Sequence, residues 1–400
     1  MKKPILITLL LLLTAPCLYA QRKELSQARS YIKSGKDYDK AEKLMADIVA
    51  KDSAGRLNPK VYLLWHQAVL RQYEQGNEKL YLKQNYDTAL IFNLTKRMFT
   101  ILESLDSIDA LPQKNGKVKP KYRRKHAELL NKLRPNLYFG GSFYTRKKDY
   151  ATAYTFFDTY IDCTKQPLFT GYNYEQTDTT LKKAAYWATY CGAKINNPTL
   201  TLQYADMARQ DTAKLQFLLM YIAEAYSTAK NDTAWLATLK EGFSKFPKAE
   251  YFFIHLTDYH NAHGNADKAL QLADRALATD STSLLFLFAK STALLNLGRY
   301  DDCIVASDSL IAVNDSLPDA YYNAGMAYMN KILAAEEASN ARKQKKSIMA
   351  LYSKALPYME KCRALAPDDK QKWAPALYKI YLNLNRGKQF EEIDKLLNNK

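Results

Sequence analysis

The sequence lacks the short motifs by which many enzymes are recognised. It contains no Gly-rich phosphate-binding loop, no nucleophile elbow and no Cys-x-x-Cys pair. No convergent acid–base set can be named, so we expect no enzymatic activity and no cofactor. An enzyme whose active site is built from the insertions described below stays open as an alternative.

Metal ligands are also scarce, since the 400 residues include only 5 His and 5 Cys. The densest group is the segment 255–263, which holds three His residues and Asp258. At about 100° per residue on a helix, His260 and His263 are neighbours, whereas Asp258 and His260 point to nearly opposite sides. Because zinc needs three or four ligands that converge on one point, we expect no metal site and assign His260 a packing role.

Long apolar runs are missing as well. The longest is Ile5–Leu13, which follows Met1-Lys2-Lys3 and precedes the small residue Ala20. A run of nine is too short for a bilayer span, which needs about 20 residues, so no transmembrane segment is expected. The pattern of residues 1–20 is typical of a secretory signal peptide. We predict cleavage after Ala20 and export to the periplasm or the outer membrane of a Gram-negative bacterium.

Acidic residues are outnumbered by basic ones. The 58 Lys and Arg against 41 Asp and Glu give a net charge of +17, and removal of Lys2 and Lys3 would leave +15. An exported protein meets little nucleic acid, so no nucleic-acid partner is expected. The excess suits an anionic envelope surface, an acidic polysaccharide or an acidic protein, or it serves solubility alone.

What the sequence does contain is a repeated unit. Residues 182–317 divide into four uninterrupted blocks of 34 residues, which start at Lys182, Gln216, Glu250 and Leu284. In the third block, Phe253, Leu256 and His260 share one helical face, Gly264-Asn265 breaks the chain, and Ala269, Ala273 and Ala276 mark a second helix. Each block therefore predicts a helical hairpin whose apolar stripe must be covered by a neighbouring hairpin.

The period and its preferred residues resemble the tetratricopeptide repeat (TPR) family, which repeats as helix–turn–helix every 34 residues. The family prefers small or aromatic residues at positions 8, 11, 20, 24 and 27 and proline at 32 of the repeat. The second block matches with Ala223, Tyr226, Gly242 and Pro247, and the block that starts at Pro318 matches with Gly325, Tyr328, Ala355, Met359, Cys362 and Pro367. Departures are Lys290 at position 7, His260 at 11 and Trp235 at 20.

This resemblance implies an all-α fold: a right-handed superhelical solenoid of antiparallel helix pairs, about nine hairpins long, without a sheet. We expect N-terminal repeats over 21–181, four uninterrupted repeats over 182–317 and C-terminal repeats over 318–400. The first part has an extended hairpin with helices over 59–83 and 86–105. The last part has a helical insertion, Lys331–Ala350, with Ile332, Leu333, Ile348 and Met349 available to pack its extra turns.

The cysteines fit the same repeat. Cys303 and Cys362 occupy small-residue positions, where a thiol packs like a small apolar side chain. Cys163 and Cys191 lie in adjacent repeats, so a disulfide between them stays open.

Two insertions are candidate binding segments. The basic segment Gln113–Lys125 has seven basic residues, among them Lys121, Arg123, Arg124 and Lys125, and no acidic one. It is either a solvated loop or a docking site for an anionic surface. The aromatic loop Leu168–Leu181 carries Phe169, Tyr172 and Tyr174, which either stack on a ligand or fold back onto the repeat below.

The family resemblance also implies a binding groove, lined by positions 5, 9 and 12 of each first helix. The groove residues predicted to bind are Tyr186, Tyr190, Glu224, Asp258, Asn261, Phe288 and Tyr322. These groove positions, which we call the rows, contain no lysine. A clamp for a terminal carboxylate, as in some TPR domains, is therefore not expected. The rows suit an extended peptide of basic or apolar character; a glycan stacked on the rings, or the protein's own terminus or loop, are the alternatives. We therefore predict an exported scaffold for envelope complexes, or alternatively an envelope carbohydrate-binding protein.

Overall fold

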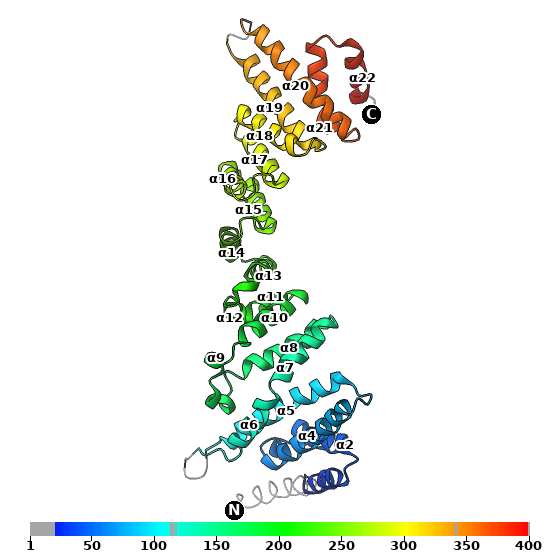
Figure 1. The fold of residues 1–400 in the computed structure, drawn as a ribbon, viewed down its shortest axis with the longest axis vertical. Helices are drawn as coiled ribbons and strands as arrows, with labels where there is room; N and C mark the ends of the chain where they lie inside the picture. The colour runs from blue at the N-terminus through cyan, green and yellow to red at the C-terminus, as the bar shows by residue number, and fades with distance from the viewer. Residues whose placement is uncertain (1–20, 113–115, 117, 340–341, 399–400) are drawn as a thin grey trace, which may run out of the picture. The chain divides into compact units, whose positions relative to one another are not determined.

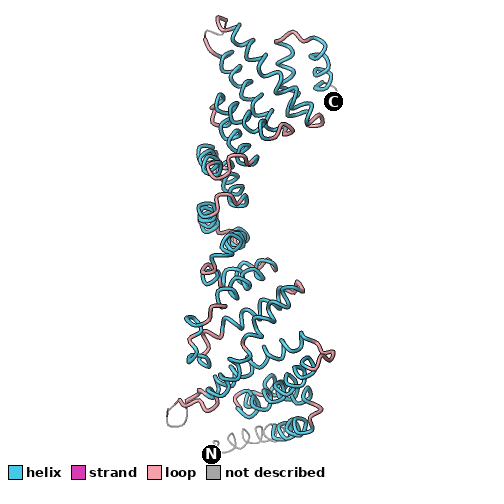
Figure 2. Tube along the Cα trace, in the orientation of Figure 1, coloured by secondary structure: helices cyan, strands magenta, loops and turns pink. Residues whose placement is uncertain are grey.

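The structure is a computed structural model that describes residues 21–112, 116, 118–339 and 342–398. The predicted signal peptide, residues 1–20, lies outside the described residues. None of the described residues lies in a strand, and helices joined by short loops make up the chain (Figure 2). The predicted all-α fold is confirmed. No helix in the described ranges is long and apolar enough to cross a bilayer.

The chain divides into two compact units between Asn231 and Asp232. We call them the N-terminal unit and the C-terminal unit and describe each by itself. The domain boundaries predicted at 181/182 and 317/318 were placed where the regular 34-residue repeats begin and end, and they stay predictions. The right-handed superhelix also stays a prediction.

The N-terminal unit begins with helical residues 21–34. Its further elements are α2 (Tyr38–Lys51), α3 (Ser53–Arg56), α4 (Pro59–Tyr81), α5 (Thr88–Asp109), α6 (Arg123–Leu133), α7 (Pro135–Arg146), α8 (Tyr150–Asp162), the 3-10 helix η1 (Pro167–Tyr172), α9 (Tyr174–Thr177), α10 (Leu181–Lys194), α11 (Pro198–Gln203), α12 (Ala205–Ala208), the 3-10 helix η2 (Thr212–Lys214) and α13 (Leu215–Thr228). The main pairs are α4 with α5, α7 with α8, and α10 with α11 and α12.

The C-terminal unit consists of α14 (Asp232–Lys245), α15 (Glu250–Ala262), α16 (Ala266–Leu277), α17 (Leu284–Asn296), α18 (Tyr300–Val313), α19 (Pro318–Glu337), α20 (Lys345–Leu365), α21 (Lys370–Asn383) and α22 (Gly387–Asn398). Sequence neighbours pack as antiparallel pairs: α15 with α16, α17 with α18, α19 with α20, and α21 with α22 (Figure 1). Each pair also packs on the next through α16 and α17, α18 and α19, and α20 and α21.

The repeat register predicted from the sequence is confirmed. First helices begin at Leu181, Leu215, Glu250, Leu284 and Pro318, which is within one residue of each predicted block start. Local signals explain the match. Ser283 caps α17 by accepting a hydrogen bond from the Phe286 N–H, and a proline opens α19.

Small residues at the repeat positions allow close helix packing. A Cβ on Gly242 would lie 2.3 Å from the ring of Phe252, and one on Gly325 would lie 2.3 Å from Met359 Sδ. Neither glycine has a strained backbone, so the requirement is space: a larger side chain would push the helices apart.

All four described cysteines are free and buried. The packing role predicted for Cys303 and Cys362 is confirmed, because both are 0% exposed. The disulfide left open between Cys163 and Cys191 is not formed. Cys163 Sγ donates to the Thr159 carbonyl, and Cys191 Sγ lies 3.7 Å from Thr145 Oγ1.

Three local expectations are corrected. In the extended hairpin, the first helix ends at Tyr81 rather than at residue 83, and the second helix ends at Asp109 rather than at residue 105. Arg123–Lys125 belong to the first turn of α6 rather than to a loop, since α6 continues the apolar face of His126 and Leu130. In the helical insertion, Ile332 and Ile348 are buried as expected, whereas Leu333 points outward and is 47% exposed. Residues 340–341 of this insertion lie outside the described ranges.

Candidate functional site

The predicted groove residues of the C-terminal unit lie at matched positions of successive first helices. We call them the first-helix face: Ile254, Asp258 and Asn261 on α15, Phe288 on α17, and Tyr322 on α19. Ile254 and Phe288 hold the same repeat position and are each 37% exposed. Asp258 and Asn261 are exposed, and Tyr322 is half-buried. Two consecutive repeats therefore each expose an apolar side chain, Ile254 and Phe288. Asp258 and Asn261 lie on the same helix as Ile254.

A buried polar bridge holds two helices of this face in register. Asn323, on α19, is 4% exposed, and its side-chain amide donates to Ser291 Oγ at 2.9 Å and to Thr292 Oγ1 at 3.1 Å on α17. Buried amides without such partners are costly, so the bridge favours one relative placement of α17 and α19. Phe288 and Tyr322 are positioned by it.

One cation near the face was not anticipated from the rows. Lys372 Nζ, on α21, lies 5.6 Å from the centroid of the Tyr322 ring. Its pKa is raised by the hydrogen bond to Asp319, and a second carboxylate, Asp369, lies 3.4 Å away. These two acids offset its charge, so the face keeps the acidic character of Asp258. No local signal in the sequence marks Lys372, because it comes from a different repeat.

Two of the three groove residues predicted in the N-terminal unit, Tyr186 and Tyr190, lie in an aromatic cluster. Tyr186 is 5% exposed; its ring packs against Trp187 at 5.4 Å and Tyr221 at 6.4 Å, and Lys214 Nζ lies 4.8 Å from it. The expectation that Tyr186 faces a ligand is corrected by this burial.

Tyr190, one turn further along α10, is half-buried between Tyr150 and Tyr221, with ring centroids 5.7 and 5.6 Å away. Burial and the hydrogen bond with Tyr150 raise its pKa to about 12. Glu224, on α13, is exposed. Of the three groove residues in this unit, Glu224 therefore has the most open surface.

The aromatic loop mostly folds back onto the unit. Phe169 and Tyr174 are 2% and 7% exposed, and Phe169 packs on Phe99 at 5.9 Å. Tyr174 stacks on the guanidinium of buried Arg134, whose other side contacts the Tyr160 ring, with both ring centroids 3.8 Å away. Of the two alternatives left open by the sequence, Phe169 and Tyr174 therefore follow the one in which the rings fold back onto the repeat below, and they anchor the loop.

Arg134 itself is held by an ion pair. Its Nη1 lies 2.7 Å from Asp178 Oδ2, which also accepts a 2.7 Å hydrogen bond from the Tyr160 hydroxyl. Only Tyr172 of the predicted loop rings stays half-buried, stacked on Tyr174 with an interplanar angle of 8°.

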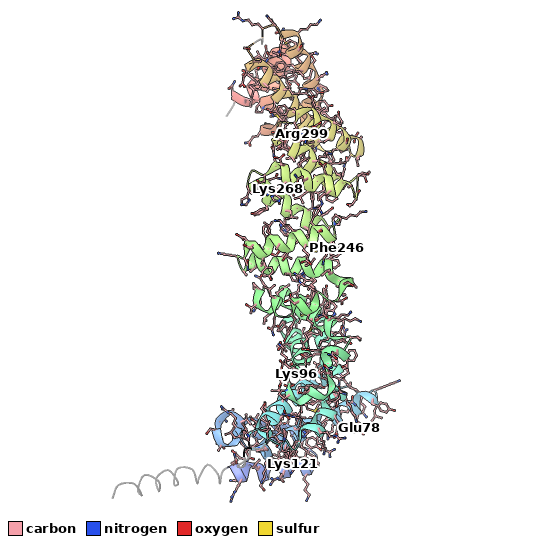
Figure 3. The ribbon with its side chains drawn as sticks, turned by 90° about the vertical axis from the view of Figure 1, so that its left-hand side faces the viewer. Glu78, Lys96, Lys121, Phe246, Lys268 and Arg299 are labelled. Atoms are coloured by element: carbon pink, nitrogen blue, oxygen red, sulfur yellow. The ribbon has the colours of Figure 1, made fainter. Side chains whose placement is uncertain are left out.

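The structure brings the basic segment and the aromatic loop together. Arg123, Arg124 and Tyr172 border one cavity of about 590 Å³, which we call the insertion cavity. Arg123 donates two 2.8 Å hydrogen bonds to buried Asp106, and Arg124 pairs with Glu128 at 3.1 Å. Lys121, labelled in Figure 3, and Lys125 are exposed. Residues 113–115 and 117 of the basic segment lie outside the described residues.

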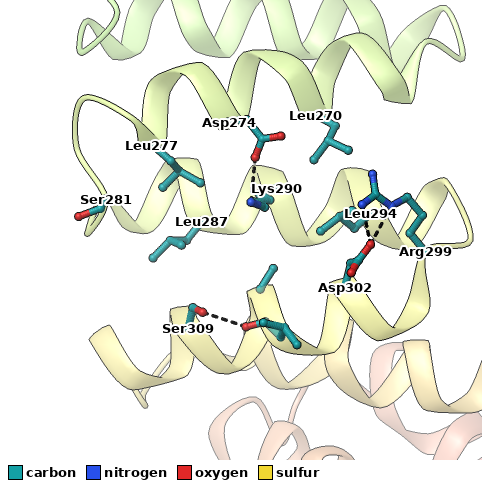
Figure 4. Close-up of a pocket in the computed structure, with 12 residues that line it drawn as sticks. Leu270, Asp274, Leu277, Ser281, Leu287, Lys290, Leu294, Arg299, Asp302 and Ser309 are labelled. Atoms are coloured by element: carbon teal, nitrogen blue, oxygen red, sulfur yellow. Dashed lines mark hydrogen bonds and ion pairs between the residues drawn. The ribbon is translucent and has the colours of Figure 1, made fainter.

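A further cavity, of about 320 Å³, lies between α16, α17 and α18 of the C-terminal unit (Figure 4). Its leucines surround two ion pairs, Lys290 with Asp274 at 2.8 Å and Arg299 with Asp302 at 2.6 Å. Lys290 departs from the family preference at position 7, and this ion pair is the physical reason that it is accommodated.

The titratable groups of the described residues include no cluster of three His, Cys, Asp or Glu side chains that could hold a metal ion. His260 is buried, in agreement with its predicted packing role, and His263 is exposed. The pKa of His66 is lowered to about 4 by burial and by His126, and that of Glu103 is raised to about 8 by burial and by Asp162. These shifted groups lie in the interior of the repeats.

No family model and no curated protein matches the chain. Solved structures do resemble it. The C-terminal part of a TPR repeat-containing protein from Cytophaga hutchinsonii is 12% identical, with 64% of this chain and 92% of that chain covered and a TM-score of 0.44. A TPR repeats protein from Bacteroides fragilis is 19% identical over 66% of this chain and 98% of that chain, with a TM-score of 0.31. Yeast Tom70 is 13% identical over 91% and 96%, with a TM-score of 0.34. The description of the fold as TPR-like rests on the chain's own helix register.

Proposed function

We propose that this chain is an exported, non-enzymatic scaffold that binds a protein or an extended peptide on the first-helix face and serves the assembly of envelope complexes. The observation that carries the proposal is the matched exposure of Ile254 and Phe288 in two successive repeats. Export is proposed from the pattern of residues 1–20 alone.

The spacing of the helices suits an extended chain. The first helices α15 and α17 touch through the rings of Phe253 and Phe286, whose centroids are 4.6 Å apart, and helices in direct contact lie about 8–10 Å apart. A peptide in the extended polyproline II conformation has three residues per turn and rises about 3.1 Å per residue, so its side chains at every third position share one face and lie about 9 Å apart. A ligand with an apolar side chain at every third position would place one such side chain on Phe288 and another on Ile254.

The charge of the face selects among peptides. Asp258 is exposed and Lys372 is paired with two acids, so a basic residue beside the apolar positions is favoured and an acidic one is disfavoured. A terminal carboxylate has no cationic partner in the predicted rows.

The test uses the mature chain, residues 21–400, on beads and an array of extended peptides with apolar residues at every third position. We compare the variant I254S/D258N/F288S with the control V305S/L382S/E391Q, which also removes two exposed apolar side chains and one exposed acid from the same unit. Peptides retained by the wild-type chain and the control should be lost by the face variant. Retention by the face variant would place the binding site elsewhere.

A second candidate function, binding of an envelope carbohydrate, is favoured by Tyr172 in the insertion cavity. One face of its ring stacks on Tyr174, and Arg123 and Arg124 border the same cavity, together with Glu128, the ion-pair partner of Arg124. Sugars stack on aromatic faces, and an acidic sugar would also meet the arginines. The change Tyr172→Ala should then reduce retention of acidic glycans and leave peptide retention intact. If it leaves glycan retention unchanged, this candidate is excluded.

A further inference from the structure

A third cavity, of about 380 Å³, lies between α14, α15 and α16 of the C-terminal unit. Lys240 on α14 and Lys268 and Arg275 on α16 border it, together with His260 on α15. Its apolar lining includes Phe243 and Leu256, and no acidic side chain borders it. We call it the cationic cavity. Lys268 is labelled in Figure 3.

Some cations of the C-terminal unit have a carboxylate partner, and the three cations of this cavity are not among them. Lys290, Arg299 and Lys372 of the same unit each have a carboxylate partner. Within the described ranges, Lys240, Lys268 and Arg275 form no ion pair; the Arg275 guanidinium lies over the Phe243 ring at 5.2 Å. Three like charges around one cavity create a positive potential that an anion would offset.

His260 provides an independent observation at the same place. Its side chain is 7% exposed, and its Nδ1 atom is buried without a hydrogen-bond partner among the described residues. The pKa of His260 is lowered by burial, then by Lys268, Lys240 and His263, so the ring senses the positive potential of the cavity. Asp258, on the opposite side of α15, belongs to the first-helix face, which makes the cationic cavity a separate surface.

We propose that the cationic cavity binds a phosphate group. A phosphate monoester carries close to two negative charges and has three terminal oxygens, which matches three separate cationic donors better than a single carboxylate does. Phe243, Leu256 and Leu272 offer apolar surface to the group that bears the phosphate. The phosphate can come from a soluble ester or from a phospholipid headgroup, and the two sources share this recognition chemistry.

The experiment titrates the mature chain, residues 21–400, by calorimetry with inorganic phosphate, with glycerol phosphate and with acetate. A flotation assay adds vesicles of four parts phosphatidylcholine to one part phosphatidic acid, with pure phosphatidylcholine vesicles as reference. The cavity variant is K240Q/K268Q/R275Q. The control K248Q/K361Q/R386Q removes the same charge from exposed positions of the same unit that do not border the cavity.

Binding of phosphate or its soluble ester supports a soluble source, and binding to the phosphatidic acid vesicles alone supports a headgroup. In either case the control should bind like the wild-type chain, and the cavity variant should bind at least about 100-fold more weakly, because several charge-assisted hydrogen bonds are lost. The NMR-detected pKa of His260 should rise when phosphate is bound, because the anion offsets Lys240 and Lys268. The proposal is overturned if no phosphate probe binds, if acetate binds as tightly as phosphate, or if the two variants behave alike.

Discussion

Glu103 should make the N-terminal unit less stable as the pH rises. This residue lies on α5, its Oε1 atom is buried without a hydrogen-bond partner among the described residues, and burial followed by the nearby Asp162 raises its pKa to about 8. In an unfolded chain the same carboxyl ionises near its ordinary pKa of 4.5. Between these two values the folded chain holds a proton that the unfolded chain has released. The free energy of unfolding therefore falls as the pH rises from about 4.5 to about 8, and this contribution is constant above that range.

The size of the effect follows from the shift. Each unit of pKa difference corresponds to about 1.4 kcal/mol, so a shift of about 3.5 units would cost on the order of 5 kcal/mol. Water that enters when the carboxyl ionises makes this an upper bound. The change Glu103→Gln keeps the shape of the side chain and removes its ionisation. The variant should match the wild-type chain below about pH 4 and exceed its stability by several kcal/mol, at most about 5, near pH 9.

Denaturant unfolding of both chains at a series of pH values measures this difference. A repeat array need not unfold in a single step, so hydrogen exchange of the α5 and α8 amides reports the local effect directly. Glu78→Gln, at an exposed position of α4, serves as the control and should show no such pH dependence. The reasoning is refuted if the difference between Glu103→Gln and the wild-type chain does not change with pH, or if the wild-type chain is the more stable near pH 9.

Two further predictions concern packing and burial. Gly242→Ala should destabilise the C-terminal unit by about 1–3 kcal/mol, because the new Cβ would lie 2.3 Å from the Phe252 ring. Gly387→Ala is the control, since a Cβ there meets no atom within 4 Å. Equal thermal midpoints for the two variants would contradict the packing argument. Arg134→Met should cost about 3–5 kcal/mol in denaturant unfolding near neutral pH, since it leaves the Asp178 carboxylate without its buried partner. The double change Arg134→Met/Asp178→Asn should recover part of that loss, and a double variant that is no more stable than the single one would argue against the ion pair.

Much of the fold follows from local rules that a sequence displays. The 34-residue spacing of apolar and small residues, together with helix starts such as Ser283 and Pro318, placed five first helices within one residue of their observed starts. Cys303 and Cys362 were assigned to the interior by repeat position alone, because position in a helical hairpin decides which side faces the neighbouring helix. The presence of the two insertions was also visible, since they interrupt a regular period, whereas the end of the basic segment was not, because Arg123–Lys125 belong to α6.

The exposure of individual rings was decided by tertiary contacts. Tyr186 holds the same repeat position as Phe288, yet Tyr221 and Lys214 cover Tyr186, whereas Phe288 stays 37% exposed. The sequence leaves open whether Tyr174 meets a ligand or the repeat below it, and the contact of its ring with Arg134, 40 residues earlier in the chain, decides for the repeat. Repeat position specifies the direction in which a side chain leaves its helix, but not what other segment lies there.

Some features of the candidate sites also follow from the sequence, and others depend on tertiary contacts. By itself, the sequence determined the helical repeat, its register, the positions of the first-helix face and the excess of positive charge, because each depends on residues within one hairpin or on composition. Only the tertiary structure joined Arg124 to Tyr172 in the insertion cavity and gathered Lys240, Lys268 and Arg275 around His260. Such sites arise where consecutive helical segments stack, and residues that are 28 or more positions apart, as Lys240 and Lys268 are, meet there only after the chain has folded.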